Sequence, residues 1–167
     1  MQITSRIAPC LWFDDQAEPA VRFYVSVFDR SRVVKVTRYT KAGHEIHKRP
    51  AGSVLTVAFE LDGQPFTALN GGPQFTFSEA ISLQVNCTSQ AEIDYYWEKL
   101  TAHGDPRAQQ CGWLKDQFGV SWQVVPAELP DLLAEPAGAE RVMDALLRMK
   151  KLDLAELKRA AGQPAHA

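Results

Sequence analysis

Hydrophobic and polar residues along the chain follow a pattern that predicts the same elements twice. In the first half, an apolar segment at 7–13 predicts a strand, and apolar residues at helical spacing over 17–28 predict an amphipathic helix. Alternating β-branched residues at 32–39 predict a second strand, and 53–69 predicts a hairpin across Asp62-Gly63, a favoured two-residue turn. The first half therefore predicts a strand, a helix and three more strands.

The second half repeats this order. Residues 80–86 predict a strand, and apolar residues at helical spacing predict a helix that begins at Ser89. Residues 107–114 and 119–125 predict the closing strands. The two halves thus share the predicted order of a strand, a helix and then further strands.

Two ten-residue segments carry the repeat most clearly. LDGQPFTALN at 61–70 and QFGVSWQVVP at 117–126 each place a turn glycine before a strand with an aromatic residue at the same offset. We therefore predict an α+β fold of two βαβββ modules, at about 1–73 and 79–126, that pair to form one domain over 1–126.

Three helix starts are predicted from capping boxes. Asp15, Ser89 and Asp153 are each followed three residues later by glutamate, which is the spacing of this motif. After Pro126 the composition changes, and residues 127–167 predict a C-terminal helical extension. This extension packs either on the sheet of its own chain or against a partner subunit, and the sequence leaves both arrangements open.

Charge and cysteine content narrow the class of protein. The net charge of −2 gives no general attraction to nucleic acid, and no apolar run reaches the ~18 residues of a membrane-spanning helix. Cys10, Cys87 and Cys111 are an odd number of widely spaced cysteines without a C-x-x-C motif. These features predict a cytoplasmic protein with reduced thiols that binds neither nucleic acid nor membranes.

The runs at 52–73 (GSVLTVAFELDGQPFTALNGGP) and 110–126 (QCGWLKDQFGVSWQVVP), with the tail at 141–162, resemble a known group. They are similar to the PhnB-like branch of the vicinal oxygen chelate superfamily, which includes glyoxalase I, extradiol dioxygenases and bleomycin-resistance proteins. The resemblance implies a glyoxalase-like fold and a homodimer. Members often carry the label 3-demethylubiquinone-9 3-methyltransferase-like, but the sequence has no glycine-rich strand-to-helix loop typical of a Rossmann-type nucleotide site.

The resemblance also allows the metal site to be tested. Metal-dependent relatives place ligands, often histidine and glutamate, on the first and last strands of a module. Strand alternation puts the following residues at the matching positions: Ala8 (or Pro9), Thr67, Ala80 and Gln123. These side chains lack the imidazole, thiolate and carboxylate donors that hold a divalent metal, so we expect no metal and no cofactor. His44 and His47 are three residues apart, but a solvated loop explains them better than a metal site.

Large aromatic and polar side chains on the predicted concave faces suggest a binding site. Trp12 and Trp113 suit a flat or apolar ligand if they line a pocket, although both could instead be core residues. Cys111 lies near basic residues, and a structural thiol competes there with a nucleophile. The candidate ligand-binding residues are Cys10, Trp12, Thr67, Asn70, Gln84, Trp113, Ser121 and Gln123.

The sequence favours a protein that binds a small organic ligand in a cavity of the paired modules, with the superfamily metal site lost. The alternative is an isomerase, lyase or dioxygenase of the same superfamily that acts on a small organic substrate. A third possibility is a structural or interaction protein that uses its C-terminal helices for assembly.

Overall fold

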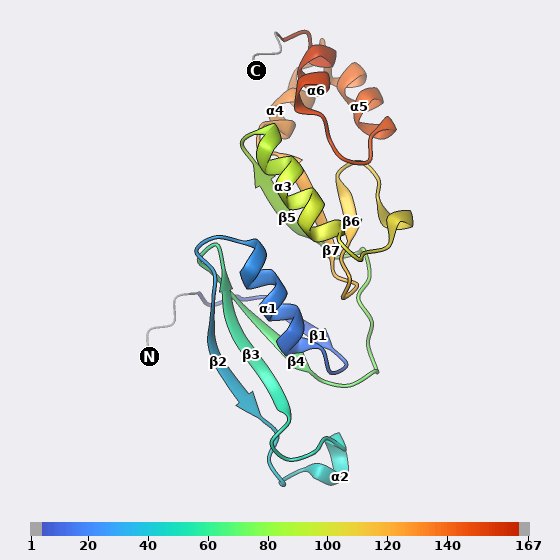
Figure 1. Ribbon diagram of the computed structural model, residues 1–167. Coiled ribbons are helices and arrows are strands. Elements are labelled where there is room, and N and C mark those ends of the chain that lie inside the picture. Colours follow the sequence, from blue (N-terminus) through green and yellow to red (C-terminus); the bar gives the residue numbers. More distant parts are fainter. Residues whose placement is uncertain (1–4, 164–167) are drawn as a thin grey trace. The chain divides into compact units, whose positions relative to one another are not determined.

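The computed structural model describes residues 5–163, which form an α+β fold of two compact units (Figure 1). The first unit ends at Phe77 and the second begins at Ser78. In each unit a helix covers one face of a small sheet, as the repeated pattern predicts.

The first unit contains a four-stranded sheet in the order β1-β4-β3-β2. Strands β1 and β4 are parallel, and the other neighbouring strands are antiparallel. A short helix, α2, interrupts the segment between β2 and β3, which the sequence predicts to be a loop. The elements are β1 (Cys10–Phe13), α1 (Ala17–Val27), β2 (Arg32–Arg38), α2 (His44–His47), β3 (Val54–Leu61) and β4 (Gln64–Asn70).

The core of the first unit lies between the sheet and α1. Leu11 and Phe13 are buried on the helix-facing side of β1, which confirms the predicted alternation. The buried residues of α1 are Ala17, Ala20, Val21, Tyr24 and Val27. The predicted hairpin across Asp62-Gly63 is confirmed, with φ angles of 48° and 81° that match a turn with two left-handed residues.

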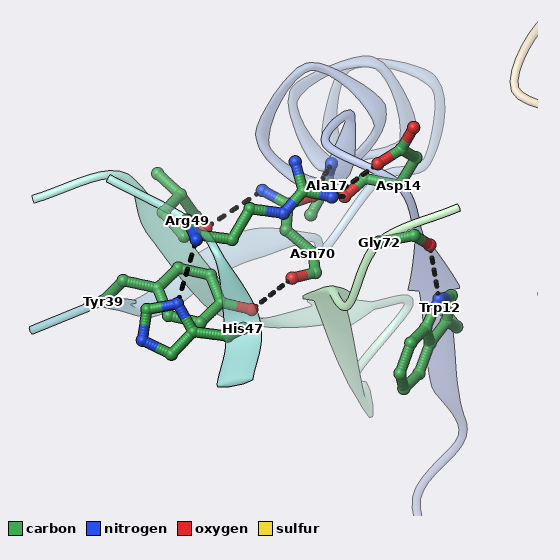
Figure 2. Close-up of polar contacts among 9 residues, drawn as sticks. Trp12, Asp14, Ala17, Tyr39, His47, Arg49, Asn70 and Gly72 are labelled. Atoms are coloured by element: carbon green, nitrogen blue, oxygen red, sulfur yellow. Dashed lines mark hydrogen bonds and ion pairs between the residues drawn. The ribbon is translucent and has the colours of Figure 1, made fainter. Parts of the chain in front are cut away.

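The predicted capping box at Asp15 is wrong. Helix α1 has Gln16 as its N-cap, and no side chain from the helix start caps it. Instead, Asn70 at the end of β4 accepts a hydrogen bond from the Ala17 N–H through its Oδ1 at 2.8 Å (Figure 2). The free N–H at the start of α1 is therefore satisfied by a residue from the sheet rather than by the local sequence.

The second unit contains a three-stranded sheet in the order β5-β7-β6. As in the first unit, the first and last strands along the chain, here β5 and β7, are parallel neighbours. Helix α3 begins with the predicted capping box, because Ser89 accepts a hydrogen bond from the Glu92 N–H. The elements are β5 (Leu83–Cys87), α3 (Gln90–Thr101), the 3₁₀ helix η1 (Pro106–Ala108), β6 (Trp113–Lys115) and β7 (Ser121–Pro126).

The predicted strand at 107–114 is mostly wrong, because only Trp113–Lys115 forms a strand there. Pro106 begins the 3₁₀ helix, and Cys111 and Gly112 have φ angles of 52° and 83°. Two successive left-handed residues turn the chain sharply, so no extended strand can pass through them.

Three helices follow the second sheet: α4 (Leu129–Ala134), α5 (Ala139–Arg148) and α6 (Leu154–Ala161). They share one core with β7, formed by Val125, Leu132, Val142, Leu146, Met149, Leu152 and Leu157. The capping box at Asp153 is confirmed by its hydrogen bond from the Glu156 N–H. The extension thus packs on the sheet of its own chain. Across residues 5–163, no helix has the length and apolar character needed to cross a membrane.

Candidate functional site

The strand register of the second unit aligns three of the predicted binding residues. Gln84 on β5 lies opposite Gln123 on β7, which lies opposite Trp113 on β6. The neighbouring Trp122 and Val124 are buried on the other side of β7. The row formed by Gln84, Gln123 and Trp113 therefore occupies the face of the sheet that points away from the core.

A cleft of about 480 Å³ opens at one end of this face. Its apolar wall includes Trp113 and Leu114, and Ser121 lies opposite Lys115 in the β6–β7 ladder. The lining residues are Glu79, Arg107, Ala108, Gln110, Cys111, Trp113, Leu114, Lys115 and Ser121. Of the predicted binding residues, Trp113 and Ser121 line this cleft, whereas Gln84 and Gln123 lie in the adjoining row.

Ser121 is the most unusual group in the cleft. Its side chain is 1% exposed, and its Oγ has no hydrogen-bond partner among the described residues. A buried polar group without a partner costs about 1–3 kcal/mol, because it has lost its bonds to water. Such a group at the wall of a cleft is a donor and acceptor that the protein itself does not use.

Two ion pairs lie at the cleft. Lys115 Nζ is 2.5 Å from Glu79 Oε1, and this contact holds the pKa of the Glu79 carboxyl below its usual value. Arg107 lies against Asp105 through two nitrogens, with Nη2 2.9 Å from Oδ2 and Nε 3.1 Å from Oδ1. Hydrogen bonds from the Arg107 side chain and backbone lower the pKa of Asp105 to about 2. The sequence pointed to Arg107 and Lys115 only as basic residues near Cys111, and it did not identify Glu79 or Asp105.

Asp116 positions the turn between β6 and β7. Its buried carboxylate accepts hydrogen bonds from the Val120 N–H at 3.0 Å and from the Trp122 indole N–H at 2.8 Å. The backbone N–H of Gly119 bonds to the Asp116 carbonyl, so the predicted tight turn before Gly119 is confirmed. Asp116 thereby fixes the strand ends that present Lys115 and Ser121.

Cys111 lines the cleft and also contacts the C-terminal helices. Its backbone N–H donates to the Met149 carbonyl at 2.9 Å, and its side chain packs against the helical core. Gln110 places its Nε2 3.4 Å from the Cys111 Sγ. These contacts give the residue a structural role, and a nucleophilic role stays a prediction.

In the first unit, Cys10 lies opposite Thr67 in the parallel pair of β1 and β4. Both side chains are on the face away from α1. Desolvation raises the pKa of the Cys10 thiol, which disfavours the thiolate that a nucleophile or a metal ligand needs. Cys10 and Thr67 thus lie side by side, and their contact with a ligand stays a prediction.

Trp12 is held against the segment that follows β4. Its indole N–H donates to the Gly72 carbonyl at 2.8 Å (Figure 2). The ring lies over Gly71, where an added Cβ would come within 2.2 Å of the indole. Trp12 is half-buried, so it combines a packing role with a partly open face.

Asn70 lies on the opposite side of β4 from Thr67, among buried groups. Besides capping α1, its Nδ2 donates to the Val54 carbonyl at 3.1 Å, and its backbone carbonyl accepts a hydrogen bond from the Tyr39 hydroxyl (Figure 2). Asn70 also borders a second cleft of about 210 Å³, beside Arg49. Its amide already has two internal partners, and a ligand contact stays a prediction.

The four positions that the resemblance matches to metal ligands carry no imidazole, thiolate or carboxylate side chain. Thr67 offers a hydroxyl, and the Gln123 amide donates to Ser82 Oγ at 2.8 Å. Ala8 and Ala80 precede the strands on which they were expected, because β1 begins at Cys10 and β5 at Leu83. Within residues 5–163, no group of three or more histidine, cysteine, aspartate or glutamate side chains is arranged to hold a metal ion.

The two histidines of the first unit have other contacts. His47 Nδ1 accepts a hydrogen bond from the Arg49 N–H at 3.0 Å, and the His47 ring packs against Tyr39 (Figure 2). His44 lies against the His47 ring at right angles, with centroids 5.9 Å apart. The pair therefore stabilises the β2–β3 connection.

Comparisons with known proteins agree with this architecture. The family model described as 3-demethylubiquinone-9 3-methyltransferase matches residues 5–125. A solved PhnB protein from Bacillus cereus is 36% identical, with a TM-score of 0.62 over 74% of this chain and 100% of that chain. No curated protein matches the chain.

More distant structures show the same fold. The fosfomycin resistance protein FosX from Mesorhizobium loti is 18% identical, with a TM-score of 0.54 over 80% of this chain and 99% of its own. Protein PA1353 from Pseudomonas aeruginosa is also 18% identical, with a TM-score of 0.54 over 72% of this chain and 96% of its own. The chain therefore belongs to the PhnB-like, 3-demethylubiquinone-9 3-methyltransferase family of the vicinal oxygen chelate superfamily.

Proposed function

We propose that this protein binds a small organic molecule in the cleft of its second unit, and that it does so without a metal ion. The observation that carries this proposal is the buried, unpaired Ser121 hydroxyl at the wall of the cleft. A ligand with a hydrogen-bonding group would satisfy that hydroxyl and remove the cost of leaving it unpaired.

The cleft has the composition of a small-molecule site. Its volume of about 480 Å³ lies within the range of ~300–1,000 Å³ that is common for such sites. Trp113 supplies a flat apolar surface, while Ser121 and Gln110 supply hydrogen-bonding groups. A few polar groups in a mostly apolar wall orient a ligand without holding it by charge alone.

Methyl transfer is not the function we propose, despite the description of the family. A nucleotide-derived methyl donor in a Rossmann-type site needs a glycine-rich turn between a strand and a helix. In this chain the turns before α1 and α3 are Asp14–Gln16 and Thr88–Ser89, and neither contains glycine.

The enzymatic alternative has relatives of the same fold, including the FosX proteins, whose name describes fosfomycin resistance. Their identity of 18% or less supports the fold and does not assign a reaction to this chain. Turnover of a bound compound, at a rate that falls in Gln123→Ala, would favour the enzyme over the binding protein. Homodimer formation and a cytoplasmic location stay predictions of the sequence.

The proposal can be tested by filling the cleft. Ala108 lines it, so Ala108→Trp should block binding of flat aromatic fragments, as measured by ligand-observed NMR on the full chain. Ala102→Trp is the matched control, because Ala102 is exposed at the end of α3 and does not line the cleft. Fragments that bind both variants equally, or none that binds the unaltered protein, would contradict the proposal.

The proposal that the protein binds its ligand without a metal ion needs a separate measurement. We expect elemental mass spectrometry of the purified, untagged protein to find zinc, nickel, manganese and iron each at less than one ion per chain. A stoichiometric metal that is lost in Thr67→Ala or Gln123→Ala would overturn it.

A further inference from the structure

We infer that the ligand of the cleft carries one negatively charged group, which binds Lys115 Nζ and Ser121 Oγ in the place now taken by the Glu79 carboxylate. This inference rests on the proposed function and names the chemical class of the ligand. Small organic acids with a flat apolar body fit this description.

The β6–β7 ladder places the two binding groups together. Lys115 and Ser121 are directly opposite each other, so both side chains are on the same face of the sheet and their Cβ atoms are close together. Both residues line the cleft next to Trp113. A cation and a neutral hydroxyl donor side by side can bind the two oxygens of one carboxylate.

The two carboxylates near the cleft are not held equally. Asp105 contacts two nitrogens of Arg107 and also accepts a hydrogen bond from the Arg107 backbone N–H. Glu79 reaches Lys115 from the segment before β5, and its side chain is 61% exposed. Glu79 is therefore the carboxylate that a ligand can replace, because it has a single ion-pair contact, whereas Asp105 is held by two side-chain nitrogens and a backbone N–H.

Charge balance at the cleft then defines the charge of the ligand. Lys115 and Arg107 are balanced in this structure by Glu79 and Asp105. Withdrawal of Glu79 leaves one uncompensated positive charge beside an apolar wall, and one negative charge on the ligand restores the balance. The Ser121 hydroxyl, unpaired in the present arrangement, gains an acceptor in the same step.

The test compares two probes of nearly equal shape. Benzoate carries the negative charge and benzamide does not, and the affinity of each can be measured from amide chemical shifts of residues 113–121 in the ¹⁵N-labelled full chain. We expect benzoate to bind about tenfold more tightly than benzamide, which is the effect of one charge-assisted hydrogen bond. Lys115→Met should remove that difference, so that benzoate and benzamide bind with about equal affinity.

Two further variants test the remaining groups. Glu79→Gln should strengthen benzoate binding, because no carboxylate then competes for Lys115. Ser121→Ala should weaken benzoate binding several-fold. The matched controls are Lys151→Met and Asp94→Asn, which alter another single-contact ion pair of the same unit outside the cleft and should leave both affinities unchanged.

The outcomes separate this inference from the proposed function. If benzamide binds in the cleft and benzoate binds no better, or if Lys115→Met leaves the preference for benzoate intact, the negative charge is not recognised and the inference fails alone. If neither probe shifts residues 113–121, the inference fails together with the assignment of the cleft as a binding site for flat aromatic molecules.

Discussion

Replacing Ser121 with alanine should make the protein more stable. The Ser121 side chain is 1% exposed, and its Oγ has no hydrogen-bond partner among the described residues. Removing an unpaired buried hydroxyl recovers about 1–3 kcal/mol of desolvation cost. The space left by one oxygen atom, roughly 15 Å³, costs about 0.4 kcal/mol at ~24 cal/mol per Å³. We therefore expect the free energy of unfolding to rise by about 0.6–2.6 kcal/mol.

Urea denaturation followed by circular dichroism measures this change. The midpoint should move to higher urea concentration in Ser121→Ala, while the slope of the free energy against urea stays the same. Ser89→Ala is the matched control in the same unit, because the Ser89 hydroxyl caps α3 by accepting the Glu92 N–H at 3.2 Å. Loss of that cap should lower stability by about 1 kcal/mol.

The direction of the change in stability tests whether the Ser121 hydroxyl is unpaired. If Ser121→Ala lowers the free energy of unfolding as much as Ser89→Ala does, the Ser121 hydroxyl has a partner in the folded protein, such as a bound water molecule. The reasoning that assigns it to a ligand would then be refuted.

Three other predictions follow from individual contacts. Asn70→Ala should destabilise the first unit by about 2–3 kcal/mol in the same assay, because it leaves a buried helix N–H and a carbonyl without partners. Asp116→Ala should cost about 3 kcal/mol or more, since three N–H groups lose their acceptor, and a smaller loss would show that solvent reaches the turn. Burial raises the pKa of the Cys10 thiol, and that of Cys87 to about 12, so less thiolate is present at pH 8 than in a free thiol. Peptide mass spectrometry should show that both cysteines react with iodoacetamide more slowly than N-acetylcysteine amide does, and that Cys87 is the slower of the two. Rates equal to that of the free thiol would contradict this prediction.

The sequence predicted the modules well because their signals are local. Alternation of apolar residues identified the buried side of β1 and placed Ser121 on the same side of β7 as Gln123. The turn at Asp62-Gly63 was predicted for the same reason, since its backbone conformation depends on two adjacent residues.

The sequence failed where a contact joins distant segments. The cap of α1 comes from a residue 53 positions away, so the local aspartate in the sequence was misleading. The ion pair between Glu79 and Lys115 likewise joins two segments that no motif connects. The unpaired state of Ser121 could not be predicted either, because it depends on every neighbouring donor and acceptor in the folded unit.

The distant cap on α1 has a consequence for the order of folding. Helix α3 carries its own cap in Ser89, so a peptide of this segment has what it needs to begin a helix. Helix α1 receives its cap only after β4 has paired with β1 and delivered Asn70 to Ala17. We expect α3 to gain helical structure early in refolding, whereas the first turn of α1 becomes protected from hydrogen exchange only together with its sheet.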